Sequence, residues 1–417
     1  MRLAWFSPLP PTPSGIADYS AELLPYIAER AHVDVYCQRS ALAALWRRRF
    51  PPEGTEVLAP AAFESHAPEY DAVFYHLGNN PHHRFVYEAF LERPGVAVFH
   101  DFLLHHLIAA STVEQPYKRR SLTRYQDLME GEYGEVGARL ARLRWNHVAS
   151  EFEKFLFPLN RHVAERALML VAHNQDVGRR LSLVAPEIPV AIIPHHAGRP
   201  PGEVTGVSRQ EARRRLRLPA DRFLVGHFGF LTRPKQPAAV IGGFAKLAAR
   251  EPRASLLIVG ADRSGGGLAR LIAKHGLEDR VGVAGYVDLV RFYLYLKAVD
   301  AVVNLRYPSA GESSGTFARA LAEGRATIVN DIGSFAEVPS DVALKVDVDR
   351  DQADQVGSHL ARLCADPSFR SSIEQRAKRY AREVLSPERC SDLYLQVART
   401  VATARRAETV RPGAVRA

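Results

Sequence analysis

The sequence predicts an α/β protein made of two doubly wound domains in tandem. Short apolar runs alternate with helical stretches, which is the rhythm of a parallel sheet covered by helices. This rhythm breaks once, in a Gly- and Pro-rich segment at residues 195–207, and then restarts. The length of 417 residues also suits two domains, each with its own buried core.

The first domain is predicted at residues 1–200. It opens with a strand at 2–7, a Pro-rich loop and a helix at 16–30. Further strand-like runs follow at residues 33–37, 72–76, 96–100, 168–173 and 190–194. Between residues 101 and 159 we expect a long helical insertion that is rich in Lys and Arg around residues 118–124 and 139–144.

The second domain is predicted at residues 208–385. Its strands are expected at residues 223–228, 254–259, 281–284, 301–305 and 326–330, and its helices at 238–250, 268–275, 291–297 and 315–323. After it, residues 386–403 are expected to form a helix that packs back on the first domain. Residues 404–417 are polar and Arg-rich, which predicts a disordered tail.

Composition excludes several classes of protein. With 47% hydrophobic and 24% charged residues, the chain is neither disordered nor fibrous, and no window suits a membrane-spanning helix or a signal peptide. Three distant cysteines without a CxxC motif indicate a cytoplasmic protein with reduced thiols. The net charge of +9 suits phosphate-bearing ligands, nucleic acid or an anionic membrane surface, and an Arg-rich genome composition is the alternative explanation. We find no nucleic-acid-binding motif and expect no nucleic-acid partner.

The most informative stretch for function is residues 305–337. A strand leads into a loop with Glu312, and Ser313, Ser314, Gly315 and Thr316 then open a helix. Small residues let backbone N–H groups approach a diphosphate, and the helix dipole adds a favourable field. A plain loop with a Ser cap is the alternative interpretation of the same residues.

Three motifs carry a family resemblance: PTPSGIADYS, LLIVGADRSGG and GESSGTFARALAEGRATIVNDIGSFAEVP. With them, nearly the whole chain resembles the retaining glycosyltransferases of family 4, which have two Rossmann-like domains in the GT-B arrangement. The resemblance implies transfer of a hexose from a nucleotide diphosphate sugar to an acceptor hydroxyl with retention of configuration. It also implies a carbohydrate or lipid-linked acceptor and a role in bacterial polysaccharide or glycoconjugate synthesis.

The same resemblance assigns roles in the 305–337 stretch. Glu312 would hold the transferred sugar through its hydroxyls, and residues 313–316 would meet the pyrophosphate. The family's second glutamate, which binds the ribose, falls on Ala320. We expect Glu337, or else Glu323, to replace it; the alternative is a deoxyribose donor that needs less ribose recognition.

A second loop, residues 229–235, supplies cations. Lys235 sits at the family's lysine position, whereas Phe230 occupies the arginine position. Arg233 is the candidate for the missing charge. Two cations facing a diphosphate would stabilise the charge that develops on the leaving group. Read without the resemblance, the turn is a solvated loop.

Two candidates lie in the first domain. Gly15 follows the first strand, where the lack of a side chain would let acceptor and pyrophosphate approach, and Ser14 replaces a second glycine. His100, at the end of a strand, would orient sugar hydroxyls and stabilise charge at the anomeric carbon. A hydrogen-bonded structural histidine is the alternative for His100. We place His76 in a similar position at the rim.

No metal site and no cofactor besides the donor are expected. Histidine doublets such as His82-His83 rarely bind one ion, and Asp347-Val348-Asp349 is typical of a solvated turn. The basic residues between Lys118 and Arg144 indicate a solvated helical face, with peripheral contact to the inner membrane face as the alternative.

Two further functions stay open beside the glycosyltransferase. One is a GT-B nucleotide-sugar epimerase, which would share the fold but would transfer nothing to an acceptor. The other is a non-catalytic protein that binds sugar nucleotides, since the second motif glutamate is missing. A donor-hydrolysis assay separates the three.

Overall fold

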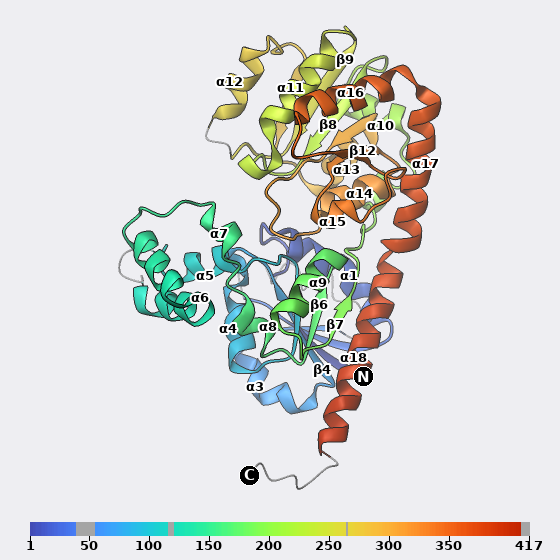
Figure 1. Ribbon diagram of the computed structural model, residues 1–417. Helices are drawn as coiled ribbons and strands as arrows, with labels where there is room; N and C mark the ends of the chain where they lie inside the picture. Colours follow the sequence, from blue (N-terminus) through green and yellow to red (C-terminus); the bar gives the residue numbers. More distant parts are fainter. Residues whose placement is uncertain (39–54, 116–120, 264–265, 410–417) are drawn as a thin grey trace. The chain divides into compact units, whose positions relative to one another are not determined.

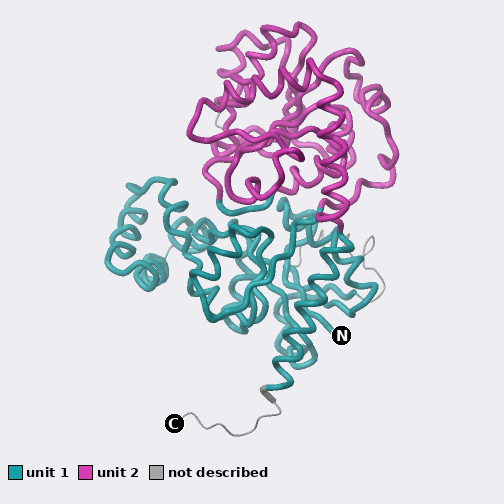
Figure 2. The backbone as a smooth tube through the Cα atoms, turned by 45° about the vertical axis from the view of Figure 1, so that its right-hand side comes forward, with its two compact units in different colours: residues 1–196, 310–313, 387–417 teal, residues 197–309, 314–386 magenta. Residues whose placement is uncertain are grey.

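The computed structural model describes residues 1–38, 55–115, 121–263 and 266–409, which fold into two compact units (Figure 2). Unit 1 comprises residues 1–196, 310–313 and 387–417, and unit 2 comprises residues 197–309 and 314–386. The first boundary falls inside the predicted linker. The predicted second domain, 208–385, is interrupted by the four residues 310–313, which group with unit 1 because the carbonyl of Ala310 accepts the N–H of Phe102.

Unit 1 is built on a parallel sheet with the strand order β3-β2-β1-β4-β5-β6-β7 in the described residues (Figure 1). Its strands are β1 (Arg2–Phe6), β2 (His32–Tyr36), β3 (Thr55–Leu58), β4 (Ala72–Leu77), β5 (Val96–Phe99), β6 (Met169–Ala172) and β7 (Val190–Ile192). The central strands are apolar and buried because helices cover both faces, which confirms the predicted doubly wound sheet.

The helices of unit 1 come from both ends of the chain. They are α1 (Gly15–Ala28), α3 (Phe63–His66), α4 (Arg84–Glu92), α5 (His105–Ser111), α6 (Leu122–Trp145), α7 (Glu153–Leu156), α8 (Arg161–Ala164), α9 (Gln175–Val184) and α18 (Pro387–Thr409). Helix α18 packs on α1, and the hydroxyl of Tyr19 donates to that of Tyr394 at 3.0 Å.

The predicted disordered tail begins too early in the chain. Helix α18 continues through residues 404–409, a segment rich in the good helix formers Ala and Arg. Arg405 donates to the carbonyl of Tyr70, and Arg406 pairs with Asp71 at 3.0 Å. Residues 410–417 of the predicted tail lie outside the described residues.

The helical insertion projects from the sheet as α5, α6 and α7 (Figure 1). Helix α6 is kinked at Gly134, whose φ of 59° is left-handed. The buried guanidinium of Arg144 binds Glu114 and Glu153, both at 2.7 Å. Part of the positive charge is therefore neutralised within the insertion, and Lys118 lies outside the described residues. No helix in the described ranges is long and apolar enough to cross a membrane.

Unit 2 repeats the architecture with the strand order β10-β9-β8-β11-β12-β13. Its strands are β8 (Phe223–Phe228), β9 (Ala254–Val259), β10 (Val281–Gly285), β11 (Ala301–Val303), β12 (Ala326–Asn330) and β13 (Leu344–Val346). Its helices are α10 (Arg209–Leu216), α11 (Pro237–Ala248), α12 (Gly267–Lys274), α13 (Leu289–Ala298), α14 (Gly315–Ala322), α15 (Gly333–Ala336), α16 (Gln352–Ala365) and α17 (Pro367–Val384). Parallel pairing brings the carboxyl ends of the strands to one edge of each sheet.

Candidate functional site

A chain of buried histidines runs along the carboxyl edge of the sheet in unit 1. His76, His100 and His173 come from the ends of the neighbouring strands β4, β5 and β6. Nδ1 of His76 lies 2.9 Å from Nε2 of His100, and Nδ1 of His100 lies 3.1 Å from Nε2 of His173. The chain ends on the carbonyl of Ile193, 2.8 Å from Nδ1 of His173.

The carbonyl of Ile193 sets the tautomer of each of the three histidines in this row. It can only accept, so the proton of His173 is on Nδ1, and its Nε2 accepts from His100. The same logic puts the protons of His100 and His76 on Nδ1. Burial lowers the pKa of His173 to about 4 and the pKa values of His76 and His100 well below the ordinary value. All three imidazoles are therefore neutral near pH 7.

This geometry bears on the two predicted histidines. Both ring nitrogens of His100 are engaged by other histidines, so a hydrogen bond from His100 to a sugar must replace one of these bonds. His76 lies near the carboxyl end of β4 but not at an exposed rim, because its ring is fully buried beside Trp5, at 4.1 Å between ring centroids. Sequence reasoning missed His173, although histidines at the ends of adjacent parallel strands were a usable signal.

The Gly15 loop is held by another histidine, His83. Nδ1 of His83 donates to the carbonyl of His76 at 2.8 Å, which leaves Nε2 to accept the hydroxyl of Ser14 at 3.2 Å. Ser14 also caps α1 through the N–H of Ile16. Gly15 is exposed and has open space where a side chain would stand, so the first turn of α1 is open to a ligand.

Glu312 lies in the short segment that belongs to unit 1. Its Oε2 accepts the N–H of Ala310 at 2.7 Å, and the residue is half-buried. Asn174 donates to the carbonyl of Gly311 and to the hydroxyl of Ser313, both at 3.1 Å. The predicted residues His100 and Glu312 thus both belong to unit 1.

In unit 2, the segments that follow β8 and β9 and the first turn of α14 form what we call the glycine cradle: Gly229, Lys235, Gly260 and Thr316. Gly229 has a φ of 88°, and a Cβ there would clash with the ammonium of Lys235 and stand 3.8 Å from the hydroxyl oxygen of Thr316. A side chain on Gly260 would clash with the backbone of Gly229. Lys235 is buried and donates to the carbonyl of Phe228 at 2.8 Å.

Helix α14 offers backbone donors beside this cradle. Ser314 caps the helix through the N–H of Phe317 and accepts from Asn304 at 3.1 Å. The N–H groups of Gly315 and Thr316 have no acceptor within the described part of the chain. Such groups at a helix start, with a lysine close by, suit a phosphate.

The remaining cations of this region differ in their surroundings. Arg233 lies in a short 3-10 turn (Arg233–Lys235) and is exposed. The guanidinium of Arg263 lies 3.9 Å from the centroid of Phe230, the residue at the expected arginine position. Arg263 is thus a second candidate cation that sequence reasoning missed, since nothing local in the sequence pairs it with Phe230.

The three positions considered for ribose recognition lie in different environments. Ala320 is fully buried in an apolar cluster with Phe228, so a carboxylate there would be costly. The carboxylate of Glu323 is paired with Lys297 at 2.6 Å. Glu337 is exposed at the end of α15, and of the two glutamates it is the more accessible to a ligand.

Two other features lie apart from these residues. Among the described residues, no group of three or more His, Cys, Asp or Glu side chains could hold a metal ion.

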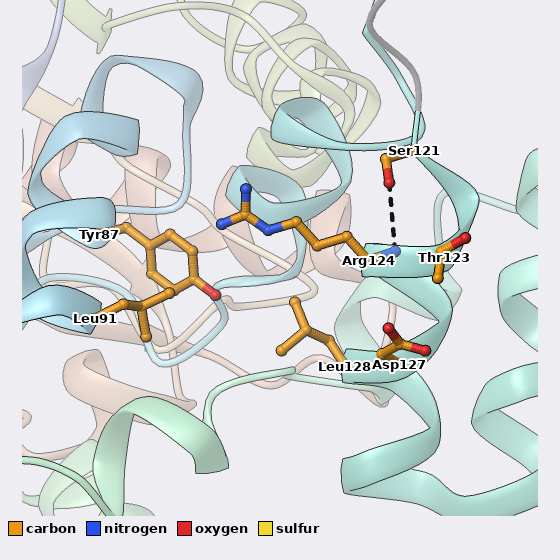
Figure 3. Close-up of a pocket in the computed structure, with 7 residues that line it drawn as sticks. All are labelled: Tyr87, Leu91, Ser121, Thr123, Arg124, Asp127 and Leu128. Atoms are coloured by element: carbon orange, nitrogen blue, oxygen red, sulfur yellow. Dashed lines mark hydrogen bonds between the residues drawn. The ribbon is translucent and has the colours of Figure 1, made fainter.

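An open hollow of about 440 Å³ lies between α4 and the start of α6, where Arg124 extends toward Tyr87 (Figure 3). It is lined by none of the predicted site residues.

The two units define the fold of the GT-B glycosyltransferases. HepE from Anabaena, solved with UDP and glucose, is 17% identical, with a TM-score of 0.65 over 97% of this chain and 100% of that chain. Sucrose-phosphate synthase from Thermosynechococcus elongatus is 16% identical, with a TM-score of 0.66 and the same coverage. A glycosyltransferase from Rickettsia africae is 11% identical, with a TM-score of 0.63 over 96% and 98% of the two chains.

Within this fold, residues 208–380 match the family model described as glycosyl transferases group 1. The match covers most of unit 2, including the glycine cradle and α14. No curated protein sequence matches the chain. Fold and family match together support a GT-B glycosyltransferase, as the sequence predicts. Membership of family 4 and retention of configuration stay predictions.

Proposed function

We propose that the protein is a retaining glycosyltransferase that moves a hexose from a nucleotide diphosphate sugar to a hydroxyl of a carbohydrate or lipid-linked acceptor. The glycine cradle carries this proposal. It combines one buried lysine, two glycines that allow close approach, and backbone donors at the start of a helix. Those features suit a diphosphate, and they lie in the stretch that matches the glycosyltransferase family.

In the proposed reaction, the bond between the anomeric carbon and the diphosphate breaks while the acceptor oxygen attacks the same face. The diphosphate leaves with the electron pair, and one of its oxygens takes the acceptor proton. Lys235 and the N–H groups of Gly315 and Thr316 stabilise the developing negative charge. Glu312 accepts hydrogen bonds from sugar hydroxyls. We assign His100 to the sugar environment, as a neutral group held in place by His76 and His173.

The test is release of nucleoside diphosphate from a panel of nucleotide sugars, with and without simple sugar acceptors and with and without EDTA. Activity that survives EDTA, with an α-linked product from an α-linked donor by NMR, is expected. An inverted product would contradict the retaining mechanism. Interconversion of the free nucleotide sugars without transfer would indicate an epimerase, and binding without turnover would indicate a non-catalytic protein.

A further inference from the structure

The segment 310–313 is anchored in unit 1 at both of its ends. The carbonyl of Ala310 accepts the N–H groups of Phe102 and Leu103, at 2.8 and 3.3 Å. At the other end, the amide nitrogen of Asn174 lies 3.1 Å from the carbonyl of Gly311 and 3.1 Å from the hydroxyl of Ser313. The residue between these two contacts is Glu312.

Asn174 is itself held rigidly. It is 5% exposed, and its Oδ1 accepts the N–H of Val177 at 2.9 Å as the cap of helix α9. Because the amide oxygen is committed to the cap, both protons on Nδ2 face the segment, one for each contact. Asn174 also follows His173 directly in the sequence, so the helix cap is adjacent to one of the three linked histidines.

The segment fits closely against unit 1. Gly311 has a φ of 86°, and a Cβ there would stand 2.6 Å from Cβ of Phe102 and 2.9 Å from Cγ2 of Val177. The guanidinium of Arg180 covers the ring of Phe102 at 3.7 Å. The backbone therefore has little room to shift toward unit 1, and the amide of Asn174 opposes a shift away from it.

We propose that Asn174 is a positioning residue for Glu312. Asn174 holds the residues on both sides of Glu312 and so fixes the position of the Glu312 backbone. The N–H of Ala310 orients the carboxylate itself. The inference rests on the proposed function, in which Glu312 binds the transferred sugar. Loss of the Asn174 contacts should impair the transfer step and leave binding of the nucleoside diphosphate intact.

The decisive variant is Asn174→Asp. Asp caps a helix as well as Asn does, so α9 is kept, but an oxygen now faces the carbonyl of Gly311. We expect kcat to fall about a hundredfold, because a small displacement of a substrate-binding group has that effect. The Kd for UDP should stay within about twofold, since, among the residues that the structure describes, Asn174 has no hydrogen bond to Lys235, Gly315 or Thr316, the groups proposed to stabilise the diphosphate. Asn146→Asp is the matched control: it removes an amide contact to a backbone carbonyl, at 2.8 Å, on an exposed turn.

Hydrogen exchange gives a second readout that does not depend on activity. Peptides spanning residues 308–316 should exchange faster in Asn174→Asp than in the wild type or in Asn146→Asp. Unchanged exchange, or a kcat within about threefold of wild type, would overturn the positioning role. If the wild type transfers no sugar at all, the proposed function fails, while the exchange comparison still decides whether Asn174 holds the segment on both sides of Glu312. If Asn174→Asp does not fold, Ser313→Ala removes one contact without touching α9 and should raise the same exchange.

Discussion

The carboxyl edges of the two sheets carry different polar groups. In unit 1, the buried imidazoles of His76, His83, His100 and His173 gather at the carboxyl edge of the sheet. Their pKa values are lowered, and nearly every ring nitrogen has a hydrogen-bond partner. In unit 2, the equivalent edge holds glycines, a lysine and, in the described residues, helix N–H groups without an acceptor; His227 on β8 is a buried imidazole beside them. The histidines of unit 1 can form neutral hydrogen bonds, whereas the glycine cradle of unit 2 carries the positive charge of Lys235. Under the proposed function, a neutral sugar suits the former and a diphosphate the latter.

Lowering the pH should have the largest effect on this difference, because it should lower the free energy of unfolding of unit 1. Burial lowers the pKa values of His83 and His173 to about 4, whereas an unfolded histidine titrates near 6.5. Between these values the unfolded chain binds protons that the folded chain does not, so stability falls as the pH drops below about 6.5. Each buried histidine should contribute about 1.4 kcal/mol per pH unit in that window.

Tryptophan fluorescence can follow this effect, because all three tryptophans lie at residue numbers assigned to unit 1. The urea midpoint of the fluorescence transition should drop sharply between pH 7 and pH 5. The drop should be smaller in His173→Gln and unaltered in His147→Gln, which replaces an exposed histidine of the same unit. A midpoint independent of pH would mean that the imidazoles are not buried as described.

Glu312→Gln should lower kcat about a hundredfold, the next largest effect. Glutamine can still accept the N–H of Ala310, so the segment keeps its shape, but the amide lacks the charge that strengthens bonds to sugar hydroxyls. Steady-state kinetics and the thermal midpoint should be measured together with the exposed control Glu165→Gln. Unchanged turnover would remove Glu312 from the site.

Lys235→Ala should weaken binding of a nucleoside diphosphate by about 1.5–3 kcal/mol, which is roughly ten- to a hundredfold in Kd. The buried ammonium of Lys235 lies against Gly229. Titration calorimetry with UDP measures it, and Lys274→Ala, on an exposed part of α12, is the control. A Kd within about twofold of wild type would contradict the assignment.

The smallest effect concerns the ribose. Ala320 lies in the core and Glu323 is paired, so we expect less than about tenfold preference for UDP over dUDP. Competition binding gives the ratio. A preference near a hundredfold would show that another carboxylate, with Glu337 as the candidate, takes both ribose hydroxyls; Glu337→Gln would then abolish the preference.

The sequence predicted strands best where they are continuous and buried. Residues 223–228, 254–259 and 326–330 were predicted with the bounds that the structure shows. The strands Thr55–Leu58 and Leu344–Val346 were missed. Each is only three or four residues long and carries a charged side chain, Glu56 or Lys345, so the apolar signal is weak.

Site prediction depended on how far apart the partners lie in the chain. The Ser314 cap and the glycine-lysine loop are local, and the structure has both. The contacts that define the histidine chain and the Arg263 stack join residues tens of positions apart, and local spacing says nothing about them. The ribose-binding position that the family resemblance places at Ala320 is buried in the apolar core, where a carboxylate would be costly.

The return of α18 to unit 1 has a consequence for biosynthesis. Tyr394 and its neighbours complete the hydrophobic core beneath α1, yet they leave the ribosome only after the whole of residues 197–386 has been translated. All strands and helices of unit 2 are therefore synthesised before the last helix of unit 1. Residues 310–313, which lie within the unit 2 part of the sequence, also belong to unit 1. The domain whose synthesis begins first is completed last, and the apolar surface of α1 and β4 that α18 covers stays exposed until then.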